Sequence, residues 1–144
     1  MFETLLQNLG LSAFSLKGFG PLLMQGTWMT VKLSVMSLLL AIVLGLLGAS
    51  AKLSKTALLR VPAQVYTTLI RGVPDLVLML LIFYSLQTWL TTFTEAMEWD
   101  YIEIDPFAAG VITLGFIYGA YFTETFRGAI LAVPRGQVEA ATAY

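Results

Sequence analysis

The chain has 144 residues, of which 58% are hydrophobic and 12% are charged, and it has a formal net charge of −1. Soluble domains carry about 25% charged residues, so this chain has roughly half the charge that a water-facing surface needs. The composition therefore indicates a membrane protein. With neither cysteine nor histidine, the chain offers no disulfide, thiol nucleophile or imidazole base, and we expect no metal site and no cofactor. The balanced charge also argues against a nucleic-acid partner.

Three long stretches contain no charged residue: 33–51, 76–94 and 106–123. A helix rises about 1.5 Å per residue and the hydrocarbon core of a bilayer is roughly 30 Å thick, so each stretch is long enough to cross it. The stretches do not alternate as the strands of a membrane barrel would. The sequence predicts an all-α transmembrane fold with spans at about 33–51, 76–94 and 106–126.

The residues before the first span contain several glycines and a proline. We expect an irregular segment that leads into a short amphipathic stretch at 22–31. A cleaved signal peptide is disfavoured for two reasons. The apolar run that follows is longer than the roughly 7–15 residues of the hydrophobic region of a signal peptide, and more basic residues follow the run than precede it.

Both later spans begin with residues that favour a helix start. Asp105 can cap the third span, and it precedes Pro106 at the first helical position, where a backbone N–H would have no partner within the helix. Pro74 and Asp75 do the same for the second span, with the carboxylate facing the positive end of the helix dipole. For Asp75 and Asp105 a structural role is therefore favoured over a functional one.

Small residues recur every fourth position on the first and third spans. Such faces let another helix backbone come close, although glycine is also simply common in membrane helices. The second span is bulkier, and we expect it to face lipid or a partner. The predicted packing residues are Ala41, Gly45 and Ala49 on the first span and Gly115, Gly119 and Thr123 on the third.

Basic and acidic residues outside the spans lie in different segments of the chain. Cytoplasmic loops of membrane proteins carry an excess of lysine and arginine, so the basic segments predict the cytoplasmic side and the N-terminus is expected outside. Glu124 and Arg127, three residues apart, can pair at the end of the third span; whether they lie within the membrane or among headgroups is left open. The basic residues are Lys52, Lys55, Arg60 and Arg71, with Arg127 and Arg135 after the third span, and the acidic ones are Glu95, Glu98, Asp100, Glu103 and Asp105.

After Pro134 and Gly136 the chain becomes rich in alanine. This favours a short helix over about 136–144, too short to span and able to sit in a groove of another protein. Glu139-Ala140-Ala141, preceded by Pro134-Arg135-Gly136-Gln137, resembles the EAA loop of bacterial ABC-importer permeases. The stretches 69–74 and 120–128 resemble two further marks of the polar amino-acid permeases, most closely those of the histidine, lysine, arginine and ornithine systems. The resemblance covers about residues 22–144.

The resemblance implies an inner-membrane permease subunit with five spans and a periplasmic N-terminus. It implies a homologous permease partner, two ATP-binding subunits on the cytoplasmic side and a periplasmic amino-acid-binding protein. This chain has no Walker A pattern, so ATP hydrolysis is expected in another polypeptide and the chain is not itself an enzyme. Residues 1–144 would be a single partial permease domain, because the family pattern continues beyond Tyr144 with a glycine and two more spans.

The resemblance also assigns candidate residues. Contact with the ATPase is expected from Glu139, Ala140 and Ala141, with Pro134 and Gly136 setting the angle of the helix. Structural or pathway roles are expected for Arg71, Pro74, Asp75, Glu124 and Arg127. Two other readings are a small membrane scaffold or inert permease fragment, and a secondary transporter. The latter usually needs an ionisable residue near the middle of a span, where this sequence has none.

Overall fold

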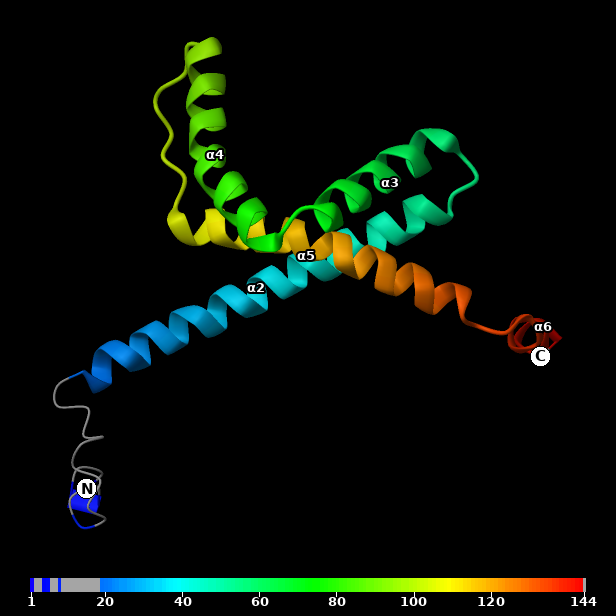
Figure 1. Cartoon of the computed structure of the whole chain (residues 1–144), viewed down its shortest axis with the longest axis horizontal. Coiled ribbons are helices and arrows are strands. Elements are labelled where there is room, and N and C mark those ends of the chain that lie inside the picture. The colour runs from blue at the N-terminus through cyan, green and yellow to red at the C-terminus, as the bar shows by residue number, and fades with distance from the viewer. Residues whose placement is uncertain (2–3, 6–7, 9–18, 144) are drawn as a thin grey trace. The chain divides into compact units, whose positions relative to one another are not determined.

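The computed structural model describes residues 1, 4–5, 8 and 19–143. The chain divides into two units, Met1–Lys32 and Leu33–Tyr144, and the packing below concerns the second. The described residues after position 19 form α2 (Gly20–Leu53), α3 (Ala57–Gly72), α4 (Asp75–Ala96), α5 (Pro106–Leu131) and α6 (Arg135–Ala143) (Figure 1). Three of these helices, α2, α4 and α5, are long and apolar enough to cross a membrane. The predicted all-α transmembrane fold with three spans is thereby confirmed.

The first helix starts earlier than the uncharged stretch suggests. Helix α2 begins at Gly20 and runs without interruption to Leu53, so the stretch expected as a short amphipathic element at 22–31 is instead the first part of the spanning helix. A glycine inside a helix costs only about 1 kcal/mol relative to alanine, and Gly26 does not interrupt the helix. The predicted irregular segment lies largely outside the described residues.

Helix α3 occupies the basic segment between the first two predicted spans, where no helix was predicted. It buries Ala63, Thr67 and Ile70, which recur at helical spacing. Its opposite side carries exposed apolar side chains, among them Leu58, which is 82% exposed. An amphipathic helix of this kind is too short to span and suits the surface of a membrane.

Helices α2 and α5 approach each other through small residues. A Cβ added to Gly45 would lie 2.5 Å from the Cβ of Phe122, and one added to Gly115 would lie 2.5 Å from the Cδ2 of Leu40. A Cβ added to Gly119 would lie 2.9 Å from the Cβ of Leu44. Ala41 and Ala49 on α2 are each 1% exposed. The small-residue faces of the two spans are therefore turned toward each other.

Helix α5 is the centre of this unit and crosses α2 (Figure 1). Its Ile117 and Ala120 are fully buried and form a core with Ile70 of α3. The hydroxyl of Tyr66 in α3 donates a hydrogen bond to the Phe116 carbonyl of α5. Burial raises the pKa of Tyr66 to about 12, so this donor keeps its proton at physiological pH.

The connection from α4 to α5 is fixed by side-chain hydrogen bonds. The Gln87 side chain accepts from the Ile104 amide at 2.7 Å and donates to the Ile102 carbonyl at 3.0 Å. The Asp105 carboxylate accepts from the Ala108 amide at 2.9 Å and caps α5, as the sequence suggested. Helix α4 itself keeps an exposed apolar side, which includes Leu76, Val77, Leu80 and Leu81.

Candidate functional site

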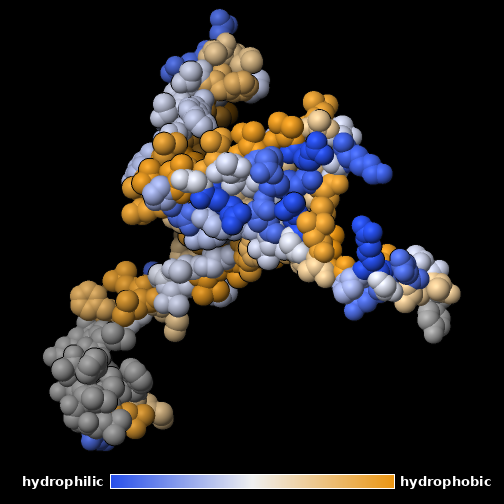
Figure 2. Space-filling model, turned by 45° about the vertical axis from the view of Figure 1, so that its right-hand side comes forward, coloured by the Kyte–Doolittle hydropathy of each residue, from blue (hydrophilic) through white to orange (hydrophobic). Residues whose placement is uncertain are grey.

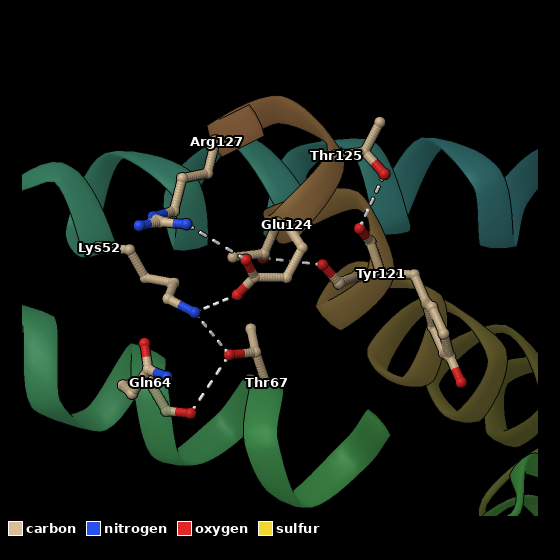
Figure 3. Close-up of polar contacts among 9 residues, drawn as sticks. Lys52, Gln64, Thr67, Tyr121, Glu124, Thr125 and Arg127 are labelled. Carbon is tan, nitrogen blue, oxygen red and sulfur yellow. Dashed lines mark hydrogen bonds and ion pairs between the residues drawn. The ribbon is translucent and has the colours of Figure 1, made fainter. Parts of the chain in front are cut away.

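A buried ion pair joins the end of α2 to α5. Lys52, in the last turn of α2, contacts the Glu124 carboxylate and also donates to the Thr67 hydroxyl of α3 at 2.9 Å (Figure 3). The Lys52 side chain is only 4% exposed and that of Glu124 is 21% exposed. The Thr67 hydroxyl donates onward to the Gln64 carbonyl at 3.2 Å. These contacts connect three helices, and we call Lys52, Thr67 and Glu124 the three-helix junction.

The position of the junction follows from the sequence. Lys52 is the first charge after the uncharged stretch of α2, and Glu124 is the first charge after that of α5. A lysine in the last turn of a helix is also favoured by the helix dipole. A buried charge is tolerated when it is paired and hydrogen-bonded, and Lys52 has both kinds of partner. Lys52 was not predicted from the sequence as the partner of Glu124.

The expected pairing of Glu124 with Arg127 is also present. The Arg127 Nη1 lies 3.6 Å from the Glu124 Oε2, one turn along α5, and the Arg127 side chain is 40% exposed. An exposed pair of this kind contributes about 0–1 kcal/mol. Arg127 therefore adds a second, outer cation to a carboxylate that is already paired with Lys52.

A second group of polar contacts joins the start of α4 to α5. The Tyr121 hydroxyl donates to the Asp75 carboxylate at 2.7 Å, and the guanidinium of Arg71 lies over the Tyr121 ring, 5.6 Å from its centroid. Pro74 stands at the N-cap of α4. Arg71 thus contacts the ring of Tyr121 and Asp75 contacts its hydroxyl. These two contacts hold the turn between α3 and α4 against α5.

A polar cavity of about 330 Å³ opens between α2, α3 and α5. Three of its charged residues are cationic and one is a carboxylate, so it has an excess of positive charge. Hydrophilic surface is gathered among the hydrophobic helices on the face shown in Figure 2. The cavity is lined by Lys52, Gln64, Thr67, Thr68, Arg71, Gly72, Glu124 and Arg127; we call it the cationic pocket.

The alanine-rich segment forms α6, Arg135–Ala143, with no buried residue. Pro134 precedes the helix, and its carbonyl accepts from the Gln137 amide at 3.0 Å. Gly136 is the second residue, and Glu139, Ala140 and Ala141 lie in the middle of the helix with exposed side chains. Tyr144, the last residue of the predicted segment, lies outside the described residues. Glu124 makes its ion pairs with Lys52 and Arg127, and neither of these residues belongs to α6.

Within the described part of the chain, no group of three His, Cys, Asp or Glu residues could hold a metal ion. The charged residues that do come together form ion pairs and hydrogen bonds between helices. This arrangement can fix the relative positions of membrane helices and transmit a movement from one to another.

Comparisons with known proteins find relatives that are permease proteins of transport systems. The chain is 60% identical to the histidine/lysine/arginine/ornithine transport system permease protein HisQ of Escherichia coli (strain K12), over 90% of this chain and 57% of HisQ. It is 43% identical to the nopaline transport system permease protein NocQ of Agrobacterium fabrum, over 86% of this chain and 53% of NocQ. The chain thus spans little more than half the length of these relatives.

A solved structure described as an amino acid ABC transporter with histidines matches with a TM-score of 0.69 and 32% identity, over 90% of this chain and 55% of that chain. The model of a protein family described as "binding-protein-dependent transport system inner membrane component" matches residues 38–144. These matches confirm the resemblance to amino-acid permeases that the sequence motifs indicated. The chain belongs to the family of binding-protein-dependent transport system inner membrane components.

Proposed function

We propose that this chain is part of the permease subunit of an ATP-driven importer for polar and basic amino acids of the histidine, lysine, arginine and ornithine class. The observation that carries the proposal is α6, a short exposed helix that bears Glu139-Ala140-Ala141 and directly follows a spanning helix. An exposed helix of small residues fits a groove on another protein. The names of the relatives support the amino-acid class.

The proposed orientation places α3 at the cytoplasmic surface of the membrane, α6 in the cytoplasm and the N-terminus in the periplasm. The segment from Lys52 to Arg71 is basic, and the connection between α4 and α5 is acidic and lies at the other end of both helices. Because the excess of lysine and arginine marks cytoplasmic segments, the charges favour this orientation. The acidic connection would then attract cationic amino acids on the periplasmic side.

The proposed partners are a homologous permease subunit, two ATP-binding subunits that hold α6 from the cytoplasm, and a periplasmic amino-acid-binding protein. Closure of the ATP-binding subunits would move α6 and the end of α5. The three-helix junction would then carry this movement to α2 and α3, since Glu124 is tied to Lys52 and through it to Thr67. Transport would be a two-state change in which rigid helices move together.

Replacing Glu139 by lysine tests the proposal. The side chain is exposed in α6, so Glu139→Lys is expected to leave membrane insertion unchanged and to break the contact with the ATP-binding subunit. In proteoliposomes that hold the whole transporter, we expect ATP hydrolysis to continue while amino-acid uptake falls at least about tenfold, the effect of losing a contact of roughly 1.4 kcal/mol. Uptake and ATP hydrolysis are measured in the same preparation.

Glu95→Lys provides a matched control. Glu95 is an exposed carboxylate near the end of α4, at the opposite end of the spans from α6. The same charge reversal there can weaken the attraction of cationic amino acids, but it should leave the ratio of uptake to ATP hydrolysis unchanged. Normal uptake by Glu139→Lys would contradict the proposed contact. Purification of the chain without any ATP-binding subunit would favour a membrane scaffold instead.

A further inference from the structure

The cationic pocket is built from charges that all lie where the apolar stretches end. Lys52 directly follows the uncharged stretch of α2, and Glu124 directly follows that of α5. Arg71 stands shortly before the uncharged stretch of α4. The pocket therefore lies at the ends of the uncharged stretches of α2 and α5 and close in sequence to the start of α4. Since hydrocarbon gives way to headgroups at this level, the pocket lies at the depth of lipid phosphates.

Helix α3 has a polar side that suits the headgroup of a lipid and an exposed apolar side that suits its acyl chains. Its polar side chains Gln64, Thr67, Thr68 and Arg71 recur at helical spacing and line the pocket. On its apolar side, Val65 and Leu69 are 50% and 62% exposed. A lipid could thus place its phosphate in the pocket and its acyl chains against the apolar side of the helix.

The charge of the pocket determines the sign of its ligand. Lys52 is neutralised by Glu124 in a buried pair. Arg71 and Arg127 remain as the excess positive charge, and Arg127 is exposed enough to reach an outside ligand. A cationic amino acid would be repelled here, whereas guanidinium groups bind phosphate oxygens well, because their fork of donors matches them.

We infer that the cationic pocket binds the phosphate of an anionic phospholipid, held by Arg71 and Arg127 and seated on the Lys52–Glu124 pair. The side chain of Lys52 is held in place at the buried side of the pocket, because it contacts both Glu124 and Thr67. The inference rests on membrane insertion and not on the proposed transport activity. It can therefore fail or hold independently of that activity.

The test measures lipid retention by the permease purified from membranes together with its copurifying partners. The protein is placed in nanodiscs of mixed phosphatidylglycerol and phosphatidylcholine, extracted, and examined by native mass spectrometry. We expect phosphatidylglycerol to be retained in preference to phosphatidylcholine. With about a five-fold contribution from each arginine near a headgroup, Arg127→Gln should lower this preference about five-fold and the double variant Arg71→Gln/Arg127→Gln about 25-fold.

Arg60→Gln is the matched control, because Arg60 is an exposed arginine of the same helix α3 that does not line the pocket. It should retain the lipid preference of the unchanged protein. Since Arg71 also packs on Tyr121, the Arg127→Gln variant alone keeps the test valid if the double variant fails to fold. An equal preference for both lipids, or an equal loss in Arg60→Gln, would overturn the inference.

A soluble competitor separates a lipid from a free phosphate. Glycerol phosphate carries the same anionic group without acyl chains, and we expect an excess of it to leave phosphatidylglycerol bound, because it cannot contact the apolar side of α3. Complete displacement of the lipid by glycerol phosphate would overturn the assignment to a lipid and identify a site for soluble phosphates.

Discussion

Replacement of Glu124 by methionine is expected to destabilise the protein by about 3–5 kcal/mol, the cost of removing one partner from a buried ion pair. The change leaves the ammonium of Lys52, whose side chain is 4% exposed, with the neutral Thr67 hydroxyl as its remaining partner. Thermal unfolding of the purified protein in detergent measures the loss.

The reverse replacement, Lys52→Met, is expected to cost less. The Glu124 carboxylate would then still have Arg127 at 3.6 Å and is itself partly exposed. The double variant Lys52→Met/Glu124→Met removes both charges and should regain most of the lost stability, because two well-packed apolar residues often replace a buried pair at little cost.

Arg127→Met is the control for this series, since its exposed pair with Glu124 should contribute no more than about 1 kcal/mol. A double variant as unstable as Glu124→Met alone would show that the charges do not act as a pair. Equal losses in Glu124→Met and Arg127→Met would show that Lys52 is not the main partner of Glu124.

The second large effect is expected at the contact between α2 and α5. Gly45→Ala introduces a Cβ that would lie 2.5 Å from the Phe122 Cβ and 3.1 Å from the Phe122 backbone carbonyl carbon. Because neither atom belongs to the flexible end of a side chain, the two helices must move apart. Overpacking of this kind costs about 1–3 kcal/mol, and Gly45→Leu should cost more.

Gly128→Ala is the matched control on α5. Nothing lies within 4 Å of the Cβ that it would add, and alanine favours a helix over glycine by up to about 1 kcal/mol. The same substitution is thus expected to stabilise the protein at residue 128 and to destabilise it at residue 45, as measured by thermal unfolding. Unchanged stability in Gly45→Ala would contradict the close approach of α2 and α5.

The sequence predicted the spanning helices because the uncharged stretches are long and end sharply. Helix α4 is observed at Asp75–Ala96, close to the predicted 76–94. Helix α3 was missed because its segment was interpreted only by its basic residues, as a connection between two spans. The helical spacing of Ala63, Thr67 and Ile70 was the available signal.

Of the two cationic partners of Glu124, the sequence predicted Arg127 but not Lys52. Spacing along one helix identified Arg127, since a pair three residues apart needs no knowledge of the fold. Lys52 lies 72 residues away in the sequence, and its pairing depends on how α2 and α5 cross. The available clue was that a lysine ends one uncharged stretch and a glutamate ends another, which places opposite charges at the same end of two adjacent spans.

The most direct test of the account is the side of the membrane on which α6 lies. Residues 1–144 contain no cysteine, so a cysteine introduced by Gln137→Cys in α6, or by Glu98→Cys between α4 and α5, is the single cysteine of this stretch, and labelling is compared with that of the unchanged protein. In intact cells with a permeabilised outer membrane, a maleimide that cannot cross the inner membrane should label the Glu98→Cys variant. It should label the Gln137→Cys variant only after the inner membrane is opened. Labelling of Gln137→Cys in intact cells would place α6 in the periplasm and contradict the proposed contact with ATP-binding subunits.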